Sequence, residues 1–212
     1  MTTSSAPSHP SHYPPSQTAL LFLDYQNVLV NMIADEERKQ KLISSAKELL
    51  ATARANNVAI IHCLIDTDND PPTTNKVSEQ WLTVHKPLLG ATPELAQEYG
   101  ELAPSDSPDG VGHESVSLRP PGYRSVLVND DLLHLLREKL GVSHLILGGI
   151  ATSGAILGTA THGTDLDFVV SVVEDAVWDP SETVHRALID NTIPTLAWVL
   201  ETKEAVGYLT KK

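Results

Sequence analysis

The sequence is poor in cysteine and in basic residues, and both shortages narrow what the chain can do. Its single cysteine, Cys63, excludes an intrachain disulfide. A chain without disulfides suits a reducing compartment, so we expect a cytoplasmic protein. Lys and Arg number 15 against 27 Asp and Glu, which gives a net charge of −12. We therefore expect no nucleic-acid partner and no binding to anionic membranes.

Long apolar runs are also missing. No run approaches the roughly 20 residues needed to span a bilayer, and the first residues show neither the basic nor the apolar region of a secretory signal. Residues 1–17 instead carry four prolines and five serines, a composition that predicts a flexible tail. The remaining stretch, 18–212, has the length and apolar content of one domain.

Short apolar runs alternate with segments of helical periodicity through this domain. The runs predict strands at residues 18–23, 58–65, 114–118, 144–148, 168–174 and 195–200. The periodic segments predict helices at residues 36–54, 129–140, 153–163 and 180–191, and a last helix opening at residue 202. Residues 66–114 form an irregular insert. Such alternation predicts an α/β fold with a mostly parallel sheet and helices on both faces.

Polar residues follow two of the predicted strands at the end where parallel sheets bind ligands. Asp24, Gln26 and Asn27 come directly after the first strand. A carboxylate at the mouth of a buried strand is desolvated, which raises its pKa toward a value useful for acid–base catalysis. The Gly149–Thr152 turn precedes a helix, so its N–H groups can stabilise developing negative charge. An ion pair or helix cap at Asp24, and an ordinary turn at 149–152, are the competing interpretations.

Two segments, DYQNVLV after the first strand and LILGGIATSGAILGTATHGTDLDFVVSVVEDA later, resemble the isochorismatase-like hydrolase superfamily. The resemblance spans roughly residues 18–200 and is weakest in 66–118. It implies a three-layer α/β/α sandwich around a six-stranded sheet, and a homo-oligomer such as a dimer or tetramer. In the amidase branch an Asp activates a Cys nucleophile, and a Lys assists. Asp24 matches that Asp. The resemblance also places an oxyanion hole at Ile150, Ala151 and Thr152, often with a cis peptide between the first two.

The chain departs from the amidase pattern at the other two catalytic positions. The Cys position is Ala155, and a methyl group is not a nucleophile. The Lys position falls on Pro121, and the nearest cations are Arg119 and Arg124. Either arginine can hold the Asp24 charge or a substrate carboxylate, whereas neither can act as an acid because Arg stays protonated.

Three functions follow. The first is hydrolysis of a small amide or related C–N bond, with Ala155 as an engineered or natural replacement of the nucleophile. The second is a hydrolase or lyase of the isochorismatase type, which uses Asp24 as acid or base without a Cys. The third is a pseudoenzyme that binds a small molecule without turnover. We assign Asp24, Ala155 and Arg119 to catalysis, and Gln26, Asn27, Tyr123, Arg124 and Trp81 to substrate binding.

No cofactor or metal is expected. Asp66-Thr67-Asp68 lacks the histidine of the nicotinamidase metal site and the glycine and glutamate of a calcium loop. Cys63 and His62 lie within an apolar strand. We interpret Cys63 as a structural thiol and His62 as a core histidine, since buried cysteines are usually inert.

Overall fold

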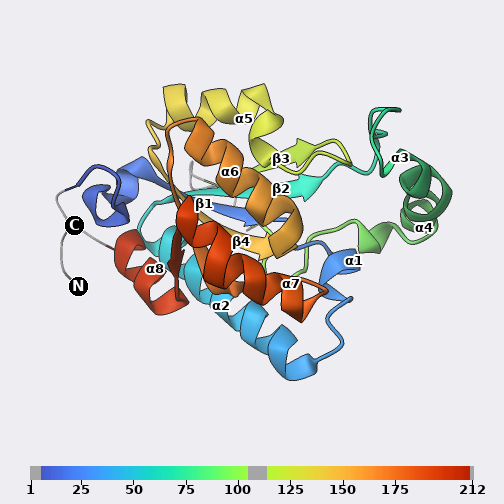
Figure 1. Ribbon diagram of the computed structural model, residues 1–212, viewed down its shortest axis with the longest axis horizontal. Coiled ribbons are helices and arrows are strands. Elements are labelled where there is room, and N and C mark those ends of the chain that lie inside the picture. Colours follow the sequence, from blue (N-terminus) through green and yellow to red (C-terminus); the bar gives the residue numbers. More distant parts are fainter. Residues whose placement is uncertain (1–5, 105–113, 211–212) are drawn as a thin grey trace.

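A computed structural model describes residues 6–104 and 114–210. Its six strands form one sheet in the order β3-β2-β1-β4-β5-β6 (Figure 1). Every strand pairing is parallel, which confirms the predicted α/β class. The strands are β1 (Thr18–Leu23), β2 (Ala59–Ile65), β3 (Glu114–Arg119), β4 (His144–Ile150), β5 (Val169–Trp178) and β6 (Trp198–Leu200).

Helices cover both faces of the sheet, as expected for a three-layer sandwich (Figure 1). They are α1 (Asn27–Val30), α2 (Glu36–Ala55), α3 (Ser78–Gln80), α4 (Lys86–Ala91), α5 (Asp130–His134), α6 (Leu157–Asp165), α7 (Glu182–Ala187) and α8 (Thr202–Leu209). Apolar side chains of α2 and α8 form the core on one face. Those of α5, α6 and the segment after α7 form the core on the other. No helix among the described residues is long and apolar enough to cross a membrane.

Short 3-10 and π-helical turns extend or connect these helices. The 3-10 turns are Pro10–His12, Pro15–Gln17, Pro93–Leu95, Val126–Val128 and Ile193–Thr195, and the π-helical turns are Trp81–His85, Leu135–Lys139, Thr152–Ile156 and Leu188–Thr192.

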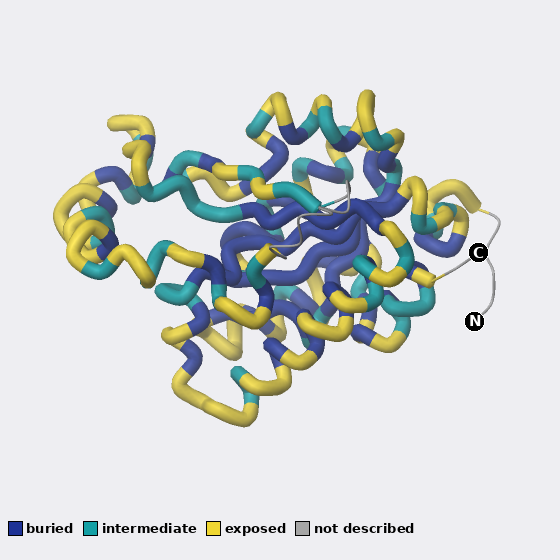
Figure 2. Tube along the Cα trace, turned by 180° about the vertical axis from the view of Figure 1, so that it is seen from behind, coloured by how far each residue is buried: buried dark blue, intermediate teal, exposed yellow. Residues whose placement is uncertain are grey.

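The central strands are apolar because both of their faces are covered. All six residues of β1 and all seven of β4 are buried, and the sheet forms the buried centre of the chain in Figure 2. Asn57 lies two residues after the end of α2 and has a φ of 52°. Gly141 follows α5 and the π-helical turn that extends it, and has a φ of 64°. These two residues end the helices where the sequence predicts, since Asn and Gly accept the left-handed conformation most easily.

The structure differs from the predicted elements at the end of β5, at the start of β6 and at the starts of two helices. β5 continues to Trp178, where its last residues pair with Gly149 and Ile150 of β4. β6 begins only at Trp198, because a 3-10 turn takes up residues 193–195. The predicted helix at 153–163 begins with a turn in which Gly154 is not helical. The side chain of Ser181 caps α7, so this helix begins at Glu182 and not at residue 180.

Residues 6–17, which the sequence assigns to a flexible tail, instead form two 3-10 turns that pack against the domain. The ring of His9 lies 4.5 Å from that of Trp198, whose Nε1 donates a hydrogen bond to the carbonyl of Ser8 at 2.9 Å. Pro10 is buried. The prediction of a flexible tail is wrong for these residues because their prolines restrict the backbone and aromatic contacts hold the turns against the domain. The composition of the segment does not reveal these contacts. Residues 1–5 lie outside the described part.

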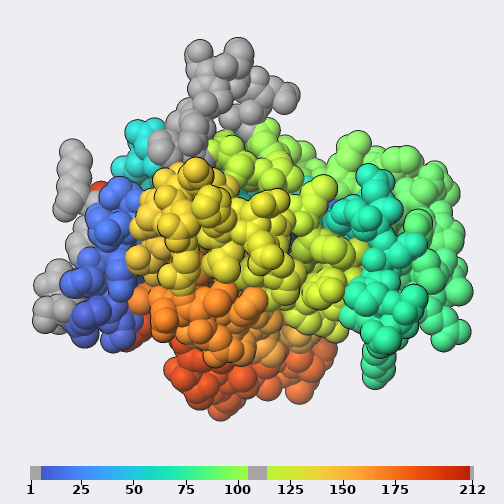
Figure 3. All heavy atoms as spheres, turned by 90° about the horizontal axis from the view of Figure 1, so that it is seen from above, coloured from blue at the N-terminus to red at the C-terminus, as the bar shows by residue number. Residues whose placement is uncertain are grey.

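The insert after β2 carries α3 and α4 away from the body of the sheet (Figure 1). Seen from above, these residues form the teal and green end of the molecule (Figure 3). The insert returns to the sheet beside the segment that follows β1, where Gln26 pairs with Glu98 in an antiparallel bridge. Tyr99 also donates its N–H to the carbonyl of Tyr25. The insert is therefore attached directly next to Asp24.

Candidate active site

A cavity of about 320 Å³ lies at the carboxyl ends of β1, β2, β3 and β4. Asp24, Ile65, Arg119 and Ile150 line it from these four strand ends. The insert supplies an apolar wall, which includes Val77, Trp81, Leu88 and Leu89, and the α1 region adds Leu29 and Met32. The location agrees with the general position of ligand sites in parallel sheets.

Asp24 and Arg119 form an ion pair inside this cavity, through Oδ2 of the carboxylate and Nη2 of the guanidinium. Their exposed fractions are 2% and 5%. Burial raises the pKa of Asp24 to about 6, and the charge of Arg119 limits the rise. Oδ1 of Asp24 and Nε of Arg119 are buried and have no hydrogen-bond partner among the residues that the structure describes. Arg119 also donates to the carbonyl of Tyr123 at 2.9 Å, which orients its guanidinium.

The turn after β4 presents Ile150, Ala151, Gly154 and Ala155 to the cavity. The peptide between Ile150 and Ala151 is cis, as the resemblance implies. Ala155 is buried at the cavity wall, in the position where the resemblance places a nucleophile. Two N–H groups of the turn are engaged: Ser153 donates to Asp179 at 2.8 Å, and Gly154 donates to the carbonyl of Ala151 at 2.9 Å.

Gly149 allows the turn to sit this close to Asp24. Its φ is 144°, and a Cβ at this position would lie 2.0 Å from the carbonyl oxygen of Leu23. Only glycine fits such a contact without moving the backbone. The second glycine of the LILGGI run therefore brings β4 against the end of β1.

Two buried side chains hold the turn from the side away from the cavity. His185 Nδ1 lies 2.8 Å from Thr152 Oγ1, and the Asp179 carboxylate accepts from the N–H groups of Ser153 and Ser181. Burial lowers the pKa of His185. Thr152 does not line the cavity. The contact of Asp179 with Ser153 depends on the extended end of β5, which Asp179 directly follows.

The structure separates Gln26 and Asn27, which the sequence groups as substrate contacts. Gln26 lines the cavity, and its amide donates to the carbonyls of Ile65 and Ala96 while Oε1 accepts from the N–H of Ile65. Asn27 does not line the cavity, and its amide donates to the carbonyl of Glu94. Both amides therefore hold the insert in place.

Trp81, Tyr123 and Arg124 all line the cavity. Trp81 is 7% exposed, and its buried indole Nε1 finds no hydrogen-bond acceptor among the described residues. The apolar wall around Trp81 escapes sequence reasoning because these residues come from the irregular insert, where no periodic pattern marks them.

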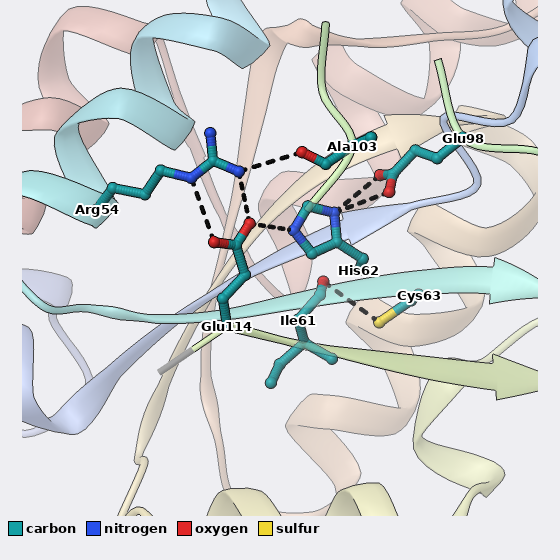
Figure 4. Close-up of polar contacts among 7 residues, drawn as sticks. All are labelled: Arg54, Ile61, His62, Cys63, Glu98, Ala103 and Glu114. Atoms are coloured by element: carbon teal, nitrogen blue, oxygen red, sulfur yellow. Dashed lines mark hydrogen bonds and ion pairs between the residues drawn. The ribbon is translucent and has the colours of Figure 1, made fainter. Parts of the chain in front are cut away.

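His62 and Cys63 lie beside one another on β2 but outside the cavity, as their core assignments predict (Figure 4). The His62 ring lies 2.9 Å from carboxylate oxygens of both Glu98 and Glu114, and Arg54 pairs with Glu114. The Cys63 thiol is fully buried, and burial raises its pKa. A thiol of this kind is a poor nucleophile.

Comparison with known proteins agrees with this geometry. The model of the isochorismatase domain family matches residues 18–204. The chain is 26% identical to the ureidoacrylate amidohydrolase RutB of Pantoea ananatis, over 94% of this chain and 86% of that protein. It is 28% identical to RutB of an Enterobacter species, over 94% and 92%.

Solved structures share the fold. A cysteine hydrolase from Pseudomonas syringae has a TM-score of 0.77 at 19% identity, covering 93% of this chain and 94% of that one. The nicotinamidase PncA of Bacillus subtilis has a TM-score of 0.67 at 18% identity, covering 87% and 99%. The fold, the match across 18–204 and the curated relatives together show that this chain belongs to the isochorismatase family of hydrolases.

Proposed function

We propose that the chain hydrolyses a C–N bond of a small molecule, with Asp24 as the acid–base group and water as the nucleophile. The observation that carries this proposal is the state of Asp24. It is buried, Arg119 holds one of its oxygens, and the other oxygen has no hydrogen-bond partner within residues 6–104 and 114–210. Burial raises its pKa to about 6. Such a carboxylate can accept and return a proton near neutral pH.

The proposed reaction has two proton transfers. Ionised Asp24 takes a proton from water while the oxygen of that water molecule bonds to the substrate carbonyl carbon. Protonated Asp24 then gives the proton to the departing nitrogen. An amide and one water thereby yield an acid and an amine. Ala155 supplies no covalent step, so the bond to carbon is formed by water alone. RutB relatives are named as amidohydrolases, which supports a C–N bond as the target.

A second candidate is proton donation by Asp24 to a vinyl ether, followed by addition of water. The absence of a thiol at Ala155 favours it, because this reaction needs no covalent nucleophile. A pKa of about 6 leaves a protonated fraction of Asp24 near neutral pH, and that fraction is the acid required.

A substrate panel with a matched variant tests the proposal. Small amides, ureides and vinyl ethers are incubated with the chain and with Asp24→Asn, and products are quantified by mass spectrometry. We expect hydrolysis of at least one amide or ureide, with about a hundredfold loss or more in Asp24→Asn. Turnover of vinyl ethers alone selects the second candidate. If neither class of compound is turned over, the proposal is wrong and the chain is better described as a pseudoenzyme that binds a small molecule.

A further inference from the structure

Arg124 occupies a place in the cavity that two glycines make available. Its side chain lies against Gly154 and Gly158, four residues apart in the helical segment after β4. A Cβ at Gly154 would lie 3.3 Å from Nη1 of Arg124, and a Cβ at Gly158 would lie 2.5 Å from its Cβ. Since Gly154 and Ala155 both line the cavity, the guanidinium stands next to the position of the absent nucleophile.

The charges around the cavity do not cancel. Among its lining residues the charged side chains are Asp24, Arg119 and Arg124. Asp24 and Arg119 neutralise each other. Arg124 lies at the exposed mouth, and within the described residues it has no ion pair and no hydrogen bond. Apart from His85, the side chains that line the cavity therefore sum to one positive charge, in a chain whose net charge is −12.

We propose that the substrate is a small carboxylic acid with an apolar body, and that Arg124 binds its carboxylate. The inference rests on the proposed function and names its substrate class. A single guanidinium matches the charge and the two oxygens of one carboxylate. The apolar wall formed by Met32, Trp81 and Leu88 contacts the body of the substrate. Asp24 and Ala155, deeper in the cavity, then face the bond that is cleaved.

Binding can be tested without turnover. The probes are phenylacetate and 2-phenylethanol, which share an apolar body and differ in charge, and the readout is calorimetric affinity. We expect phenylacetate to bind at least about tenfold more tightly than the alcohol. Arg124→Met removes this advantage, and Arg124→Lys retains part of it. The matched control is Arg137→Met, because Arg137 is an exposed arginine over the ring of Phe168 and outside the cavity.

Two results overturn the inference. One is equal affinity for the two probes, or no saturable binding of phenylacetate. The other is an unchanged phenylacetate affinity in Arg124→Met, with circular dichroism showing that the variant is folded. Added salt should weaken phenylacetate binding and leave the alcohol unaffected, since the pair is exposed to solvent.

These experiments distinguish failure of the substrate class from failure of the proposed function. If phenylacetate binds through Arg124 but no acid-bearing amide is hydrolysed, the proposed function fails and the substrate class stands. If neutral amides are hydrolysed as well as acidic ones, and Arg124→Met turns over both equally, the proposed function stands and the substrate class is wrong.

Discussion

Arg119 holds one carboxylate oxygen of Asp24, and the other oxygen meets no hydrogen-bond donor in the described part of the chain. The two residues come from the ends of β1 and β3, with β2 between them. The pair keeps a buried charge compensated, which an isolated carboxylate in this position would not be. The free oxygen is then available for proton transfer in the cavity.

The pH dependence of turnover should follow Asp24. Its pKa is raised to about 6, so the carboxylate is ionised above that pH and protonated below it. If Asp24 acts as a base on an amide, kcat/KM rises as the pH increases through about 6. If it acts as an acid on a vinyl ether, kcat/KM falls through the same range. A profile with no inflection near pH 6 would contradict both roles.

Replacing Arg119 should move that inflection. The Arg119 charge lowers the pKa of Asp24 against the effect of burial, so Arg119→Gln raises the pKa and shifts the inflection to higher pH. The exposed pair of Arg186 and Asp190 offers a control, and Arg186→Gln should leave the inflection in place. The measurement is kcat/KM against pH for the three chains. A shift to lower pH in Arg119→Gln would show that Arg119 does not stabilise the ionised carboxylate.

The close approach at Gly149 should make this residue intolerant of any side chain. In Gly149→Ala the Cβ meets the Leu23 carbonyl and the backbone holds an unfavourable φ. We expect the free energy of unfolding to fall by roughly 2–4 kcal/mol. Gly90→Ala is the matched control, because no atom lies within 4 Å of the new Cβ. Urea denaturation of the two variants measures the difference, and equal stability would exclude the contact.

The contact between Asp179 and Ser153 should protect the turn locally. In Asp179→Ala the N–H of Ser153 loses its acceptor, so its hydrogen exchange should accelerate by roughly tenfold or more. The amide of Leu147, within β4, should change less. Asp190→Ala, at an exposed ion pair, serves as the control. Uniform acceleration of Ser153 and Leu147 would mean that the whole domain is destabilised and that Asp179 has no special effect on the turn.

A thiol at position 155 should be reactive where the natural thiol is not. Cys63 is buried and its pKa is raised, so the unmodified folded chain should resist iodoacetamide. Ala155→Cys places a thiol on the cavity wall beside the Asp24 pair, and we expect one equivalent of labelling and a gain of amide turnover. Ala155→Ser controls for size. Labelling without a gain of turnover would show that a thiol at this position does not act on the amides tested, and no labelling would contradict the placement of position 155 on the cavity wall.

Much of this protein follows from local sequence. The parallel sheet follows from six short apolar runs, and the carboxyl-end location of the site follows from that sheet. Asp24 is predicted as a site residue because it directly follows a buried strand, and Ala155 is predicted only because the segment around it resembles the family's nucleophile turn. The end of β5 and the starts of β6 and α7 are harder to predict from the sequence, because capping and strand pairing outside the apolar runs decide them.

By itself, the sequence determined the fold class and the buried strands, since periodicity carries that information, and Ala155 as the nucleophile position stays a prediction of the family resemblance. Only the tertiary structure decided that Arg119 pairs with Asp24 while Arg124 forms no ion pair with any described residue, although both arginines lie within a few residues of Pro121. It also decided that the insert forms the apolar wall, that residues 6–17 pack on Trp198, and that Asp179 holds the turn. Each of these depends on contacts between residues far apart in the chain, and such contacts leave no periodic signature.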